Sequence, residues 1–162
     1  MPAVREIAPS DLPTVLAINN AHAAELSLLD AAQLERLVTV AAARLALGPE
    51  RAPDAFLMAF DERTPPQGAN HSWFLARHRR FLYVDRVCVA AHAQKRGLAR
   101  ALYEAFMEHG QAVGVPLLCC EVNTEPPNPA SDAFHRAMGF TPVGEAFLAD
   151  RGKTVRYFER RL

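Results

Sequence analysis

A glycine turn between an apolar run and a long amphipathic segment constrains the fold of this chain more than any other feature. Residues 81–89 are almost continuously apolar, residues 94–99 read Gln-Lys-Arg-Gly-Leu-Ala, and residues 98–113 place apolar side chains at helical spacing. This order predicts a buried strand, a tight turn and a helix, whose first N–H groups suit a phosphate. An ordinary basic turn is the alternative. Three side chains add positive charge at this end of the helix: Lys95, Arg96 and Arg100.

A second pattern lies downstream, in residues 128–140. Asn128 is a common helix N-cap residue, Pro129 suits the first helical position, and Gly139 suits the position just past a helix end. The segment between them predicts a helix with two different faces. Its polar face holds Asn128, Ser131, Asp132 and His135. The opposite face is expected to meet the core and holds Ala130, Ala133, Phe134, Ala137 and Met138.

Together these two motifs resemble those of the GNAT N-acetyltransferase superfamily. Residues 94–99 are similar to its acetyl-CoA motif, Q/R-x-x-G-x-G/A, and residues 128–140 are similar to its N-x-x-A-x-x-x-Y-x-x-x-G-F helix. The resemblance implies an α/β GNAT fold (acyl-CoA N-acyltransferase), a mixed, mainly antiparallel sheet flanked by helices. Two positions depart from the pattern: Ser131 stands where Ala is common, and His135 stands where many members carry Tyr.

The resemblance also implies that acetyl-CoA is the cosubstrate, and it assigns three groups of residues to it. The turn and the start of its helix would hold the pyrophosphate, through Gln94, Lys95, Arg96, Gly97, Leu98, Ala99 and Arg100. The backbone of Val87, Cys88 and Val89 would bind pantetheine and the thioester oxygen, because fixed backbone donors stabilise a developing oxyanion. The side chains of Asn123, Asn128 and Ser131 would contact the pantetheine arm, with strand-end and N-cap roles as the alternatives.

Three side chains are candidates for proton transfer. His135 occupies the family's general-acid position, and an imidazolium with a pKa near ~6.5 can protonate a thiolate whose conjugate acid has a pKa near ~8.5. Asp85 and Glu121 are carboxylates inside apolar runs, so either is a candidate base for an alkyl ammonium with a pKa near ~10. The alternatives are a solvated surface position for His135 and a structural ion pair for the carboxylates, such as one with Arg86.

Length and composition indicate one domain over residues 1–162 and exclude several kinds of partner. Of the 162 residues 50% are hydrophobic, and 18 basic side chains balance 18 acidic ones. This balance favours neither nucleic acid nor an anionic membrane as the main partner. No apolar run reaches the roughly 20 residues that span a bilayer, and residues 1–7 lack the pattern of a secretory signal.

Cysteine and histidine usage bears on the cellular compartment and on metal binding. The three cysteines form an odd set within apolar runs, which argues against a disulfide framework and favours a cytoplasmic protein. The six histidines show no metal-binding spacing, so no metal is expected.

The rest of the chain supplies further elements. Helical spacing predicts one helix from residue 12 and another that carries Leu34, Leu37, Val38, Ala41 and Leu45 before Gly48 ends it. Residues 71–80 alternate poorly and are interpreted as irregular or as a short helical linker. Strands are predicted at residues 4–8, 55–60 and 117–122, with a hairpin formed by residues 140–148 and 154–159.

The sequence thus predicts an N-acetyltransferase that moves an acetyl group from acetyl-CoA to a primary amine by direct attack in a ternary complex. A small metabolite or amino-acid-like acceptor is favoured, and a protein N-terminus or lysine is the alternative. A non-catalytic acyl-CoA-binding module is a third hypothesis, since a binding fold need not carry chemistry. A dinucleotide-binding module is disfavoured, because Gly97 is the only glycine of the turn.

The acceptor is expected to enter beside the first helices and the segment that precedes residue 81. Each polar or aromatic side chain there is, taken alone, more often structural than functional. The candidates are Asn19, Asn20, His22, Glu25, His71, Trp73, Phe74 and Arg77. Whether two copies form a homodimer is left open.

Overall fold

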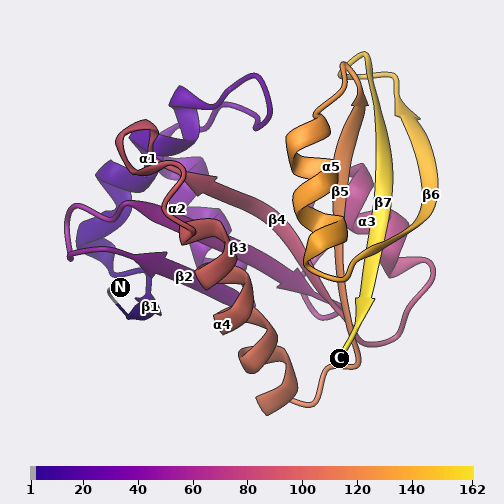
Figure 1. Cartoon of the computed structure of the whole chain (residues 1–162), viewed down its shortest axis with the longest axis horizontal. Helices are drawn as coiled ribbons and strands as arrows, with labels where there is room; N and C mark the ends of the chain where they lie inside the picture. Colours follow the sequence, from indigo (N-terminus) through magenta and orange to yellow (C-terminus); the bar gives the residue numbers. More distant parts are fainter. Residues whose placement is uncertain (1–2) are drawn as a thin grey trace.

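The computed structural model describes residues 3–162, which form one seven-stranded sheet with helices on both faces (Figure 1). Along the sheet the strands follow the order β1-β2-β3-β4-β5-β7-β6. The strands are β1 Val4–Glu6, β2 Ala43–Leu47, β3 Ala55–Asp61, β4 Leu82–Val89, β5 Leu117–Glu125, β6 Thr141–Leu148 and β7 Lys153–Arg161. The helices are α1 Leu12–Ala21, α2 Ala31–Val40, α3 Ala69–Leu75, α4 Leu98–Ala112 and α5 Pro129–Ala137, with short 3-10 turns at Pro9–Asp11 and Ala91–Ala93.

Strands β4 and β5 are the parallel pair in an otherwise antiparallel sheet. They pair only at Leu82–Leu118 and Tyr83–Cys119, and beyond these residues they spread into a V (Figure 1). On its other side β4 pairs with β3 as far as Ala55–Val89. Within residues 3–162, the backbone groups on the inner edges of the V therefore have no strand partner, and their N–H and C=O groups are open to a ligand.

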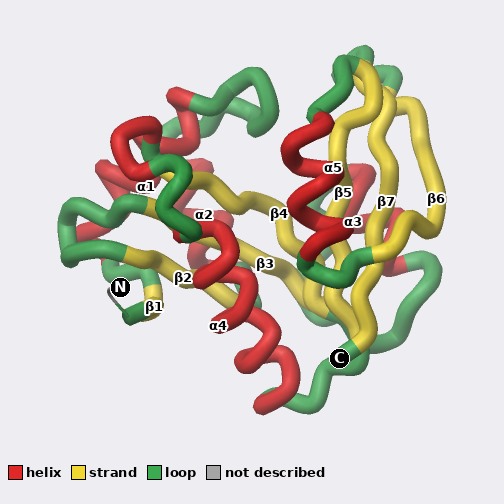
Figure 2. Tube along the Cα trace, in the orientation of Figure 1, coloured by secondary structure: helices red, strands yellow, loops and turns green. Residues whose placement is uncertain are grey.

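Helices α4 and α5 cover one face of the sheet, and α1, α2 and α3 cover the other (Figure 1 and Figure 2). Successive residues of β3 show why, because their side chains alternate between the two faces. Leu57 packs with Leu102 of α4, whereas Phe56 and Met58 pack with Val15 of α1. None of the helices within residues 3–162 has the length and apolar composition that crossing a bilayer requires.

Most of the predicted elements are confirmed, with ends displaced by a few residues. The strand, turn and helix around Gly97 appear as β4, an αL turn and α4, and the hairpin appears as β6 and β7. Residues 71–80 include most of α3, in agreement with a short helical linker. The first strand, β1, ends at Glu6. The segment of residues 1–7 was predicted to lack a secretory signal, and its first two residues lie outside the described residues.

The prediction of one helix from Leu34 through Leu45 is wrong. Helix α2 ends at Val40, and residues 43–47 form β2. This strand pairs with β1 on one side and β3 on the other, for example Leu45 with Glu6 and with Leu57. Its Ala-Arg-Leu-Ala-Leu sequence has good helix propensity, but pairing on both edges outweighs that local preference.

Candidate active site

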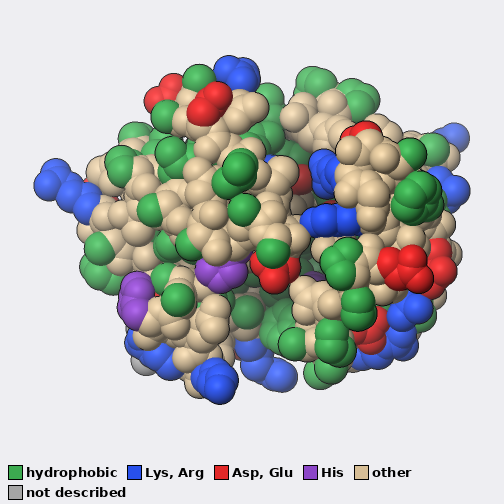
Figure 3. Space-filling model, turned by 90° about the horizontal axis from the view of Figure 1, so that it is seen from above, with side chains coloured by type: hydrophobic (Ala, Val, Ile, Leu, Met, Phe, Trp, Pro, Cys, Tyr) green, Lys and Arg blue, Asp and Glu red, His purple; other side chains and the backbone are tan. Residues whose placement is uncertain are grey.

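The V between β4 and β5 holds a cavity of about 310 Å³. The space exists because the strands part after Tyr83. In Figure 3 a hollow separates two parts of the surface, and basic and acidic side chains lie along it. The cavity continues from the face covered by α4 and α5 to the loop between α1 and α2. Its strand walls are Val84, Asp85, Val87, Cys88 and Val89 from β4 and Cys120, Glu121, Val122 and Asn123 from β5.

The predicted phosphate turn lies at one end of this cavity. Gly97 occupies the N-cap position of α4 with φ +75°, so it has no side chain to satisfy the first-turn N–H groups. A cavity of about 330 Å³ adjoins the turn. Arg96 is not among the residues that line it, and Arg100 donates to Glu104 at 3.0 Å. The lining includes Gln94, Lys95, Gly97, Leu98, Ala99 and Arg100 together with Val89 and Phe134.

Helix α5 brings the other predicted contacts to the same cavity. Asn128 caps the helix by accepting from the Ser131 N–H at 3.3 Å, which agrees with its predicted N-cap role. Asn123 accepts the Asn128 N–H through its backbone carbonyl at 3.1 Å, which closes the loop before the helix. All three side chains line the cavity beside His135.

The predicted division of α5 into a polar and an apolar face is right in part. Asn128, Ser131 and His135 line the cavity, and Phe134 and Met138 pack with the core, as predicted. The three alanines are wrongly assigned to the core, because Ala130, Ala133 and Ala137 are exposed. Residues 131, 134, 135 and 138 follow i, i+3, i+4, i+7 spacing and so form one face. Alanine buries too little apolar area to set the orientation of a helix against phenylalanine and methionine. Asp132 lies outside this face and pairs with Arg136 and Arg156.

His135 is buried, with 4% of its surface exposed, and both ring nitrogens have a partner. Nδ1 lies 2.7 Å from the Ser131 carbonyl oxygen, and Nε2 lies 2.7 Å from the Tyr103 hydroxyl. A carbonyl only accepts, so Nδ1 carries a hydrogen, and in the neutral ring Nε2 accepts from Tyr103. Burial lowers the pKa of His135, partly offset by the Ser131 carbonyl and Asp132. The solvated surface alternative for His135 is therefore excluded.

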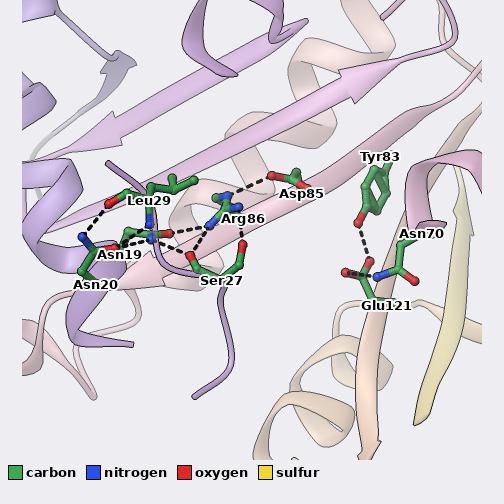
Figure 4. Close-up of polar contacts among 9 residues, drawn as sticks. All are labelled: Asn19, Asn20, Ser27, Leu29, Asn70, Tyr83, Asp85, Arg86 and Glu121. Atoms are coloured by element: carbon green, nitrogen blue, oxygen red, sulfur yellow. Dashed lines mark hydrogen bonds and ion pairs between the residues drawn. The ribbon is translucent and has the colours of Figure 1, made fainter. Parts of the chain in front are cut away.

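Glu121 projects from β5 into the other side of the opening. Its Oε2 accepts from the Tyr83 hydroxyl at 2.8 Å, and its Oε1 accepts from the Asn70 amide at 3.1 Å (Figure 4). Burial raises the pKa of Glu121 to about 7, against the lowering effect of the bond from Tyr83. Glu121 has no salt bridge among the described residues, so it differs from the structural ion pair considered as an alternative.

Asp85 has that ion pair. Its Oδ2 accepts from the Arg86 Nε at 3.0 Å, although burial still raises the pKa of Asp85. Arg86 also donates to the Asn19 side chain and the Ser27 carbonyl, each at 2.9 Å, and to the Ser27 hydroxyl at 2.8 Å (Figure 4). Asp85 thus faces the cavity while its partner holds the loop of residues 22–30 against β4.

A polar recess of about 50 Å³ adjoins the cavity on the side of Glu121. It is bounded by the loop before α3, the loop of residues 22–30, β4, β5 and the turn between β6 and β7. The cavity and the recess share Glu25, Leu26, Asp85 and Glu121, so they meet at the two carboxylates inside the strands. The other side chains that line the recess with charge or hydrogen-bonding groups are Ser27, Gln67, Asn70, Tyr83, Arg86 and Arg151.

The predicted acceptor-side residues divide into three groups. His22 and Glu25 line the cavity, and Asn19 and Asn20 make hydrogen bonds that hold the loop after α1. The remaining four lie on α3 or just after it: His71, Trp73 and Phe74 pack with Tyr83 or Tyr157, and Arg77 lies over the Trp73 ring. Four residues that contact the candidate proton-transfer groups directly or through one partner were not predicted as site residues: Asn70, Tyr83, Tyr103 and Tyr157.

Comparison with known proteins agrees with this geometry. The family model described as "Acetyltransferase (GNAT) family" matches residues 30–140, which is most of the chain. The chain belongs to the GNAT acetyltransferase family. No curated protein sequence matches it closely enough to count as a relative.

Solved structures of other GNAT proteins share its fold. NAA60 of Arabidopsis thaliana, in complex with acetyl-CoA, is 16% identical with a TM-score of 0.79 over 100% of both chains. The ribosomal-protein-S18-alanine N-acetyltransferase of Escherichia coli is 17% identical with a TM-score of 0.75 over 99% of this chain and 94% of its own. A ribosomal-protein-alanine N-acetyltransferase of Brucella melitensis is 22% identical with a TM-score of 0.75, over 98% and 99%.

Proposed function

We propose that this GNAT protein transfers the acetyl group of acetyl-CoA to a primary amine by direct attack in a ternary complex. The CoA pyrophosphate lies at the N-terminus of α4, and the pantetheine arm follows the cavity past Asn128. The thioester then lies in the V, where backbone N–H groups near Val87 stabilise the oxyanion that forms on attack. The acceptor reaches the thioester from the polar recess on the opposite side.

The observation that carries this proposal is the position of Glu121, where the cavity meets the recess, with a pKa raised to about 7 by burial. An alkyl ammonium has a pKa near ~10 and must lose a proton before it attacks. A carboxylate with a pKa near neutrality takes that proton better than an ordinary glutamate, because the donor and acceptor are more closely matched. Glu121 is therefore the proposed base, and Asp85 is the second candidate.

The departing thiolate needs a proton, and His135 is the proposed donor. Its resting form is neutral at pH 7, since burial lowers its pKa and Tyr103 donates to Nε2. To act as an acid the ring takes up a second proton from solvent at Nε2, and this N–H then donates to the Tyr103 hydroxyl, which also lines the cavity. The hydroxyl passes its own proton to the CoA sulfur as it takes the Nε2 proton, and His135 returns to its neutral form. The amine proton, which Glu121 has taken, then leaves Glu121 to solvent.

The acceptor is best described as a primary amine. The recess of about 50 Å³ is much smaller than the cavity of about 310 Å³ that it adjoins, so the part of the acceptor that enters it beside Glu121 is small. This favours a small amine or amino-acid-like acceptor. A protein N-terminus is the second candidate, because the Escherichia coli and Brucella melitensis structures bear the names of ribosomal-protein-alanine N-acetyltransferases.

Release of CoA from acetyl-CoA across a panel of amines tests the proposal. The panel contains alkyl amines, amino acids and peptides with free N-termini. We expect turnover with at least one class and a loss of about 100- to 10,000-fold in kcat for Glu121→Gln. Binding of acetyl-CoA by the wild type without CoA release from any amine would instead support the non-catalytic binding module.

A further inference from the structure

The side chains behind Glu121 form a buried chain that crosses three elements. Glu121 of β5 contacts Asn70 of α3, and the Asn70 Oδ1 accepts from the hydroxyl of Tyr157 on β7 at 2.9 Å. Tyr157 is 1% exposed and Asn70 is 6% exposed. Trp73, also on α3, stacks on the Tyr157 ring with the centroids 4.2 Å apart. We infer that Tyr157 and Asn70 are positioning residues that hold the Glu121 carboxylate for proton transfer, an inference that rests on the proposed role of Glu121.

The chemistry of the three groups allows one orientation of the Asn70 amide. An ionised carboxylate only accepts, so the amide must present its NH₂ group to Glu121. Its oxygen then faces Tyr157, whose hydroxyl stays protonated because burial raises the pKa of Tyr157 to about 12. The phenol therefore donates to Oδ1. A flipped amide would set an oxygen against the carboxylate and an NH₂ group against the phenol.

The arrangement leaves Glu121 free to accept a further proton. Each oxygen receives one hydrogen bond, from Asn70 or from Tyr83, and a carboxylate has about four acceptor positions. Among residues 3–162, every buried side-chain nitrogen and oxygen has a hydrogen-bond partner. Loss of the Tyr157 hydroxyl would therefore leave the Asn70 oxygen without a donor and remove the restraint on amide rotation.

The ionised form of Glu121 also depends on other titratable and charged groups. The bond from Asn70 stabilises the carboxylate, as does Arg151, whereas Asp85 opposes ionisation. Substitutions at Asn70 and Tyr157 leave these charges in place. The groups around Glu121 are Tyr83 and Asp85 from β4, Cys120 from β5, Tyr157 from β7, Arg151 from the turn before it, Tyr103 from α4 and Glu25 from the loop of residues 22–30.

Titration of Glu121 by NMR tests the inference without an acceptor. The glutamate carboxyl carbons are labelled with ¹³C, and the Glu121→Gln variant assigns the Glu121 resonance. We expect Asn70→Ala to raise the midpoint by about one pH unit, the scale of a hydrogen bond to a charged group. Tyr157→Phe should raise it by a smaller amount. Tyr103→Phe is the matched control, because it deletes a buried hydroxyl that bonds to His135 instead.

Unchanged midpoints in both Asn70→Ala and Tyr157→Phe would overturn the inference, and so would an equal shift in Tyr103→Phe. If Asn70→Ala fails to fold, the nearly isosteric Tyr157→Phe decides. With a turned-over acceptor, the acid limb of kcat/KM should move with the midpoint and activity should recover at higher pH, whereas structural damage lowers activity at every pH. Shifted midpoints without turnover of any amine would refute the proposed function and leave the positioning role intact.

Discussion

The two sides of the β4–β5 opening are built in different ways. The side proposed for CoA comes from a strand, a turn and the starts of α4 and α5, and most of its contacts to a ligand would be backbone or helix-end groups. The acceptor side joins separate elements through side-chain hydrogen bonds, such as those from Arg86 to Asn19 and Ser27. A backbone site tolerates side-chain variation, whereas the acceptor side depends on each of its polar side chains.

The largest expected effect concerns the CoA side. Gly97→Glu puts a side chain and a negative charge at the N-terminus of α4, in a backbone conformation with φ +75°. We expect acetyl-CoA affinity, measured by calorimetry, to fall by about 100-fold or more, since the pyrophosphate and the new carboxylate repel one another. Gly152→Glu is the control: Gly152 has φ +61° and open space around it, but lies in the turn between β6 and β7. Equal loss in the control would show that strain, not the phosphate site, is responsible.

A substitution of His135, on the same side, should change kcat without changing acetyl-CoA affinity. His135→Gln keeps a polar side chain of similar size beside Tyr103 but has no proton to give. We expect kcat to fall by about 100-fold while acetyl-CoA affinity stays nearly unchanged, the pattern for an interaction made in the transition state. Thermal melting checks the fold. A kcat within tenfold of the wild type would mean that water or another group protonates the thiolate.

A substitution on the proposed acceptor side should raise KM for the amine. Arg86→Met removes the bonds that hold the loop of residues 22–30 and leaves Asp85 without its ion-pair partner. We expect KM for the amine to rise by about tenfold, the unfolding free energy to fall by about 3 kcal/mol, and acetyl-CoA affinity to change little. Leu28→Ala, in the same loop and 66% exposed, is the matched control. An equal loss of acetyl-CoA affinity would contradict the division into two sides.

The same difference explains what could be predicted from the sequence. Gly97 and the Asn128 cap act over a few neighbouring residues, so their signals are local, and the strands and helices beside them were predicted correctly. Strand β2 was missed because its partners, not its composition, make it a strand. The contact between Asn70 and Tyr157 spans 87 residues and leaves no local signal. Glu121 was selected as a candidate because a single carboxylate in an apolar run is conspicuous, and its role as base remains a prediction.

The pH dependence of kcat/KM tests the central claim, that Glu121 takes the amine proton, most directly. Wild-type activity also needs protonated His135, whose pKa burial lowers, so it falls at high pH as well, and the test is made in the His135→Gln background. With its pKa raised to about 7, Glu121 is protonated and inactive as a base below that pH, so kcat/KM of His135→Gln should fall about tenfold per unit below pH 7 and level off above it. Adding Glu121→Gln should slow this variant further and remove the limb. A rate of His135→Gln that stays flat through pH 7, or an unchanged limb in the double variant, would contradict the account.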